Sequence, residues 1–106
     1  MSKFYLLDEN KKPYEVPLQE SYKVYEDPDM KIVQQEKVGD SFISTVFLGL
    51  DHSWGDQDGP ILFETMIFDG HFDQFQRRYK TYDEALQGHK DTVEMVNNYL
   101  TTPKNQ

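Results

Sequence analysis

The sequence contains no cysteine, which excludes disulfides and thiolate metal sites. It also contains no apolar run of about 18 residues, the length that a membrane-spanning helix needs. Residues 1–10 show no basic segment followed by an apolar stretch, so we predict no signal peptide. These absences favour a reducing compartment, and we expect the protein to lie in the cytoplasm.

Basic residues are few and unevenly placed. The chain has 19 acidic and 11 basic residues, a net charge of −8. Residues 38–76 contain no Lys or Arg, and their acids are Asp40, Asp51, Asp56, Asp58, Glu64, Asp69 and Asp73. Nucleic acids and anionic membranes are bound by clustered bases, so we expect neither as a direct partner. The acidic stretch either attracts a basic partner surface or only solvates loops.

The bulk composition predicts one folded domain over residues 1–106. A chain with 37% hydrophobic and 14% aromatic residues is too apolar to be disordered. A domain of 106 residues buries about 65% of the surface of its unfolded chain, which is enough for a single core. A flexible tail is expected from about residue 101, because Pro103 stops a helix.

The N-terminal quarter predicts a β-hairpin and a short helix. The apolar run 4–7 and the returning residues 14–16 flank the turn-forming segment 8–12, which is typical of a hairpin. Residues 17–26 follow with Pro17 suited to a first helical turn. The spacing puts Leu18, Tyr22 and Tyr25 on one face of a short helix over residues 17–26.

The middle of the chain predicts a sheet. Residues 30–38 alternate poorly and indicate an edge strand, whereas residues 42–50 are almost continuously apolar and predict a central strand covered on both faces. Residues 61–68 predict its antiparallel neighbour. A further edge strand is possible in the polar segment that contains Phe72, Phe75 and Tyr79.

A long helix over residues 82–100 is the clearest element. Thr81 and Glu84 have the spacing of a capping box. The side facing the sheet is expected to carry Leu86, His89, Val93, Val96 and Leu100. Gly88 inside this helix indicates close packing on the sheet. The predicted fold class is α+β, with an antiparallel sheet of four to six strands and the C-terminal helix on one face in two layers.

The segment 50–60 is the most unusual and is the candidate binding loop. Its candidate residues, with one acid from the next strand, are Asp51, His52, Trp54, Asp56, Asp58 and Glu64. A mixed nitrogen and oxygen metal site is one interpretation, with weak candidates Asp51, His52, Glu64 and His89, and with His71 as a further ligand. The spacing matches no metal motif, so we assign no metal and no cofactor. The alternative is a structural loop, in which Asp51 caps the turn and Trp54 covers the end of the sheet.

Catalytic motifs are missing, so we assign no catalytic residue and disfavour an enzyme. None of the serines lies in a nucleophile elbow, and no glycine-rich loop opens a helix to hold phosphate. His89 is more simply a hydrogen-bonded, partly buried side chain against the sheet than a ligand. Glu64, inside a strand, needs a partner that Arg77 or Arg78 can supply.

Three segments carry a resemblance to a known family. They are residues 4–10 (FYLLDEN), residues 44–52 with 63–68 (STVFLGLDH and FETMIF), and residues 78–85 with Gly88 and His89 (RYKTYDEA and GH). The chain resembles a widespread family of short uncharacterised bacteriophage and prophage proteins. The resemblance implies a small accessory protein made in the bacterial host cytoplasm, and it implies no enzymatic activity.

Three functions remain open at this point. The first is a binding protein that inhibits a bacterial defence or nucleic-acid-processing protein, an anti-CRISPR-like role, by presenting acids to a basic surface of that host protein. The second is a small-ligand (nucleotide) or metal-binding protein that uses residues 51–59. The third is a virion-associated or structural subunit. The oligomeric state is not predicted.

Overall fold

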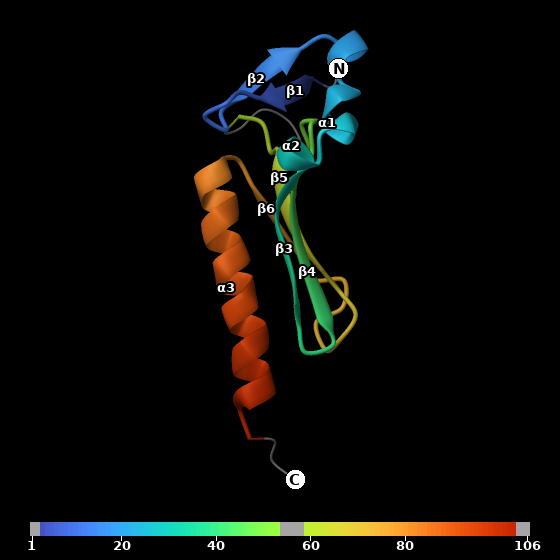
Figure 1. The fold of residues 1–106 in the computed structure, drawn as a ribbon. Helices are drawn as coiled ribbons and strands as arrows, with labels where there is room; N and C mark the ends of the chain where they lie inside the picture. The colour runs from blue at the N-terminus through green and yellow to red at the C-terminus, as the bar shows by residue number, and fades with distance from the viewer. Residues whose placement is uncertain (1–2, 54–58, 104–106) are drawn as a thin grey trace.

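The structure, a computed structural model, describes residues 3–53 and 59–103. Trp54, Asp56 and Asp58 of the predicted binding loop therefore lie outside the described residues. The fold is α+β, as predicted. It contains a four-stranded antiparallel sheet, a second two-stranded sheet and a C-terminal helix packed on the larger sheet (Figure 1).

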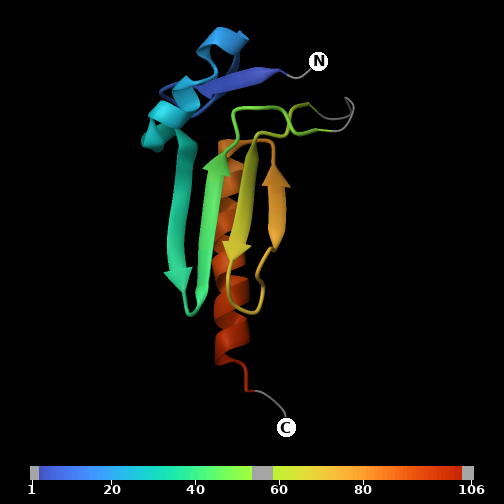
Figure 2. The same ribbon diagram turned by 90° about the vertical axis from the view of Figure 1, so that its right-hand side faces the viewer.

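The main sheet is an antiparallel meander in the order β3-β4-β5-β6 (Figure 2). Its strands are β3 (Ile32–Val38), β4 (Ser41–Phe47), β5 (Phe63–Phe68) and β6 (Gln76–Tyr79). The predicted antiparallel pairing of the two apolar strands is confirmed, with Phe42 opposite Phe68 and Phe47 opposite Phe63. The two predicted edge strands, β3 and β6, do lie at the edges.

Helix α3 (Tyr82–Thr101) lies along one face of this sheet (Figures 1 and 2). The predicted capping box is present: the Glu84 N–H donates to Thr81 Oγ1 at 3.1 Å, and Glu84 Oε1 accepts from the Thr81 N–H at 3.2 Å. These bonds satisfy helix-end donors that would otherwise be unpaired. Within residues 3–53 and 59–103, no helix is both long and apolar enough to cross a membrane.

Gly88 brings the helix backbone into direct contact with the sheet, as the sequence indicates. A Cβ atom at this position would overlap the ring and hydroxyl of Tyr79. Tyr79 is the last residue of β6, and its ring is buried between that strand and the helix. Any residue other than glycine would therefore hold α3 away from the sheet.

In the part of the chain that the structure describes, no helix covers the opposite face of the sheet (Figures 1 and 2), so the prediction that residues 42–50 are covered on both faces is wrong. Phe42 and Phe68 are side by side on this open face, with ring centroids 6.4 Å apart, and are 37% and 39% exposed. The open face also carries polar groups, such as Gln35, whose side chain donates to Ser44 Oγ at 2.8 Å. The one long helix of the described residues, α3, covers only one side of the sheet (Figure 2).

The predicted hairpin is confirmed and sits at one end of the main sheet rather than over its face (Figure 1). It consists of β1 (Phe4–Leu7) and β2 (Pro13–Val16). Its position is fixed by backbone bonds to the segment after β4: the Tyr5 N–H donates to the Gly49 carbonyl at 2.9 Å, and the Asp51 N–H to that of Lys3 at 3.1 Å. The first core cluster joins this hairpin to the sheet, through Leu6, Leu7, Val16, Phe47 and Phe63.

The single helix predicted over residues 17–26 is wrong. The chain instead forms a 3₁₀ turn η1 (Leu18–Glu20), α1 (Lys23–Glu26) and α2 (Pro28–Lys31), the last capped by Asp27. The three residues expected on one helical face, Leu18, Tyr22 and Tyr25, are 65%, 51% and 73% exposed.

The short helices expose the face of Leu18, Tyr22 and Tyr25 because a different residue of this segment, Val24, reaches the core. Val24 is buried and packs against Gly49. A Cβ atom on Gly49 would lie only 2.9 Å from Val24 Cγ2. Gly49 has a φ of +74°, a conformation that glycine adopts without strain. A short helical turn docked through one valine leaves its other faces in solvent.

The Gly88–Tyr79 contact predicts that Gly88→Ala destabilises the protein by about 1–3 kcal/mol, because overpacking a tight contact costs this much. Alanine alone would favour the helix by about 1 kcal/mol. Urea unfolding measures the difference. In a Tyr79→Leu background the ring is gone, and the same substitution should be neutral or stabilising. An equal loss in both backgrounds would contradict the contact.

Candidate functional site

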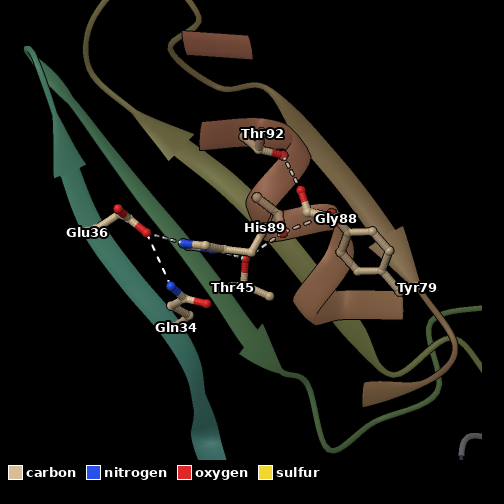
Figure 3. A network of polar contacts seen from close by, with 8 residues as sticks. Gln34, Glu36, Thr45, Tyr79, Gly88, His89 and Thr92 are labelled. Atoms are coloured by element: carbon tan, nitrogen blue, oxygen red, sulfur yellow. Dashed lines mark hydrogen bonds and ion pairs between the residues drawn. The ribbon is translucent and has the colours of Figure 1, made fainter. Parts of the chain in front are cut away.

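One polar side chain from each strand of the main sheet and one from α3 form a continuous hydrogen-bonded chain. We call it the polar chain: Glu36, Thr45, Thr65, Tyr79 and His89. The Tyr79 hydroxyl donates to Thr65 Oγ1 at 2.9 Å, and Thr65 Oγ1 lies 2.5 Å from Thr45 Oγ1. Thr45 Oγ1 then contacts His89 Nδ1 at 2.7 Å, and His89 Nε2 contacts Glu36 Oε1 at 3.0 Å. Figure 3 shows His89 between Glu36 and Thr45.

A single proton arrangement satisfies every group in the polar chain. With Tyr79 donating to Thr65, the Thr65 proton goes to Thr45 and the Thr45 proton to His89 Nδ1. His89 is then the neutral tautomer with its proton on Nε2, which donates to the Glu36 carboxylate. Each hydroxyl donates once and accepts once, apart from the terminal Tyr79 donor, so no buried donor lacks an acceptor.

The order carboxylate, histidine and hydroxyl matches that of a nucleophile-activating triad, but the hydroxyl is not accessible. Thr45 is 0% exposed and His89 is 1% exposed, beneath α3. The Thr45 oxygen is also held by Thr65 on its other side. No substrate reaches an atom that is buried in this way, so we assign the polar chain a structural role. The interpretation of His89 as a buried, hydrogen-bonded histidine is confirmed.

The sequence analysis missed most of this chain. Thr45 is the middle member of the inward-facing series Ile43, Thr45 and Phe47, and Thr65 is the middle member of Phe63, Thr65 and Ile67. Two threonines opposite each other in two apolar strands are a usable signal for a buried polar pair. That signal was available in the sequence, but only the register makes the two residues partners.

The side chain of Asp51, in the predicted binding loop, accepts hydrogen bonds from backbone N–H groups of the same loop and of the segment that follows it. Its Oδ1 accepts from the Ser53 N–H at 2.8 Å and from the Ile61 N–H at 3.0 Å. Burial alone would raise the pKa of the Asp51 carboxyl, but these hydrogen bonds outweigh it and bring the pKa below its ordinary value. The alternative of a structural loop capped by Asp51 therefore agrees with the described geometry. The backbone N–H of His52 donates to the Ile61 carbonyl at 2.9 Å.

The structure separates the other weak metal candidates. Glu64 pairs with Arg78 at 3.0 Å, which confirms the predicted structural pairing. Since neighbouring strand residues point to opposite faces, Glu64 lies on the open face and Thr65 points toward His89. His71 lies between β5 and β6, at the end of the sheet away from Asp51 and His52. In residues 3–53 and 59–103, no three His or acidic side chains are grouped to hold a metal ion.

A cavity of about 410 Å³ lies at the end of the main sheet farthest from the β1–β2 hairpin. Two turns form it, the one between β3 and β4 and the one between β5 and β6, together with the end of α3. Its lining residues are Asp40, Ser41, Gly70, His71, Phe72, Val96, Tyr99 and Leu100. The sequence analysis did not identify this cavity, because its residues come from three distant segments.

Comparison of the chain with known protein families, with characterised proteins and with solved structures finds no match.

The polar chain predicts that Thr45→Val lowers the free energy of unfolding by about 2–3 kcal/mol, since it leaves buried groups of Thr65 and His89 without a partner. The matched control is Thr92→Val, also buried, whose hydroxyl donates to the Gly88 carbonyl at 2.7 Å within the same helix. That change should cost less than about 1 kcal/mol. Equal losses in urea unfolding would argue against the polar chain.

The lowered pKa of Asp51 predicts an acid-sensitive contribution to stability. The unfolded carboxyl has a pKa of about 3.9, so the contribution is complete above that value and is lost as the pH falls through the lower pKa of the folded state. Urea unfolding at about pH 6 and about pH 3 should show a smaller acid loss for Asp51→Asn than for wild type. Identical acid losses would contradict this role.

Proposed function

We propose that the chain is a non-catalytic binding protein that engages a basic surface of a partner protein through one acidic end. This acidic end is defined by Asp40, Asp69 and Asp73. The resemblance to phage proteins supports a bacterial host protein as the partner, one that takes part in defence or in nucleic-acid processing. A groove built for a polyanion also accepts an acidic protein surface.

The observation that carries the proposal is that two acidic turns, far apart in sequence, lie side by side. Asp40 follows β3 and Asp69 follows β5, and the pairing of Phe42 with Phe68 brings these ends together. The turns pack so closely that a Cβ atom on Gly70 would overlap the Ser41 side chain. Asp73 belongs to the same end, because its Oδ1 accepts from the Asp69 N–H at 2.6 Å.

The acidic end also lacks neutralising bases within the described residues that form it. No Lys or Arg occurs in residues 38–76, and the last turn of α3 carries none. Several bases elsewhere are paired with acids, such as Arg78 with Glu64 at 3.0 Å and Arg77 with Asp91 at 3.5 Å. The two turns that meet at this end therefore carry three carboxylates and no base.

The test is capture of host proteins by the full chain from a bacterial lysate, compared with the variant Asp40→Asn, Asp69→Asn, Asp73→Asn. Asparagine keeps the oxygen acceptor that the turn uses, and only the charge is removed. We expect a defined host protein to bind wild type at low salt, to be released at high salt, and to bind the variant at least tenfold less, because salt screens exposed charges.

The matched control removes three exposed acids elsewhere, as Glu9→Gln, Glu26→Gln, Glu94→Gln, and changes the net charge equally. Its capture of the same protein should equal that of wild type. If both triple variants lose the partner equally, the net charge rather than the acidic end is responsible. If neither loses it, the acidic end plays no part.

A further inference from the structure

We infer that the cavity at the acidic end is a recognition pocket for an arginine side chain of a partner protein. This inference rests on the proposed function and adds the chemistry of the contact. The cavity combines three features that a guanidinium group requires: flat aromatic surfaces, a carboxylate, and a further oxygen acceptor. Its volume of about 410 Å³ lies in the range of sites that enclose small ligands.

The aromatic wall consists of His71, Phe72 and Tyr99. The rings of His71 and Tyr99 are stacked, with centroids 4.0 Å apart and an interplanar angle of 12°. Phe72 meets both rings edge-on, at 4.7 Å from His71 and 5.4 Å from Tyr99. Mutual packing holds each ring in place, so the wall is organised before a ligand arrives. A guanidinium stacks on such a surface more readily than an ammonium ion does.

The polar side is formed by two adjacent residues at the start of β4. Asp40 is exposed at the rim of the cavity and supplies a carboxylate. Ser41 lines the same cavity but is only 3% exposed. Among the residues that the structure describes, none forms a hydrogen bond with the Ser41 hydroxyl. Since no fully buried side-chain oxygen or nitrogen of the described residues lacks a hydrogen-bond partner, the Ser41 oxygen keeps some access to solvent and can hydrogen-bond a group that enters the cavity.

The remaining lining favours a side chain with an aliphatic stem. Val96 and Leu100 of α3 supply apolar surface. The side chain of Leu100 packs closely on Gly39 in the loop between β3 and β4. A Cβ atom on Gly39 would lie only 2.7 Å from Leu100 Cδ1. The three methylenes of arginine fit such a surface while the guanidinium reaches Asp40.

Two other ligand classes fit less well. A carboxylate at the rim and the absence of Lys and Arg among the described lining residues disfavour an anion. A divalent ion needs several oxygen ligands, and Asp40 is the one acid among the lining residues that the structure describes. The charge and the rings therefore select an organic cation.

The test is titration of the full ¹⁵N-labelled chain with N-acetyl-arginine methylamide, followed by NMR. We expect saturable shifts of the Ser41, Gly70 and His71 amides, with a dissociation constant on the order of 1 mM. The citrulline analogue has nearly the same shape without the charge and should bind at least tenfold more weakly. The lysine analogue should also bind more weakly. Equal binding of any analogue, or no saturable shift, would overturn the arginine assignment.

Variants locate the site and separate binding from folding. Asp40→Asn and Ser41→Ala should each weaken arginine binding at least threefold. Ser41→Ala removes a hydroxyl that has no partner among the described residues, so its urea midpoint should stay at or above that of wild type. The control Asp69→Asn removes a neighbouring charge that does not line the cavity, and it should bind as wild type does.

The failure of this inference is distinguishable from failure of the proposed function. If host capture depends on the acidic end but the arginine probe causes no shift, the acidic surface acts without a pocket. If the probe binds and Asp40→Asn abolishes it while no host protein is captured, the pocket exists and the proposed partner class is wrong.

Discussion

The close contact of α3 with the main sheet is the constraint on which the rest of the fold depends. Gly88 lets the helix backbone touch Tyr79, and the polar chain then joins Tyr79 through two threonines to His89 and Glu36. Each strand contributes one member, so a shift of any strand by one residue would turn its member to the opposite face and leave buried groups unpaired. A small sheet with one open face gains its register from this interaction, because apolar packing on one side alone is less directional.

The same contact determines the geometry at the far end of the main sheet. Once α3 is fixed at Gly88, its last two turns pass over the end of the sheet, where Val96, Tyr99 and Leu100 meet the two acidic turns. The cavity there is a consequence of helix length: a helix that ended before Tyr99 would leave no wall for it. The structural network and the proposed binding end are thus parts of one arrangement, although none of their side chains is shared.

Much of the fold follows from local signals in the sequence, and much of the site does not. The capping box at Thr81 and Glu84 and the apolar strands predict α3 and the antiparallel sheet, because these signals act within a few residues. The short helices near Val24 were missed, since a helical spacing of Leu18, Tyr22 and Tyr25 says nothing about whether a surface exists to cover them. The open face was missed for a similar reason: a continuous apolar strand indicates burial, and Phe42 is apolar but exposed.

The acidic stretch shows most directly why sequence proximity and spatial proximity differ. In the sequence, Asp51 stands between Asp40 and Glu64, near the centre of one charged region. In the fold, β4 separates Asp40 from Asp51 by its whole length, and Asp51 turns inward to hold two backbone N–H groups. Asp40 instead meets Asp69, because antiparallel pairing joins the start of one strand to the end of the next. Composition can therefore predict an acidic protein, whereas the pairing register decides which acids share a surface.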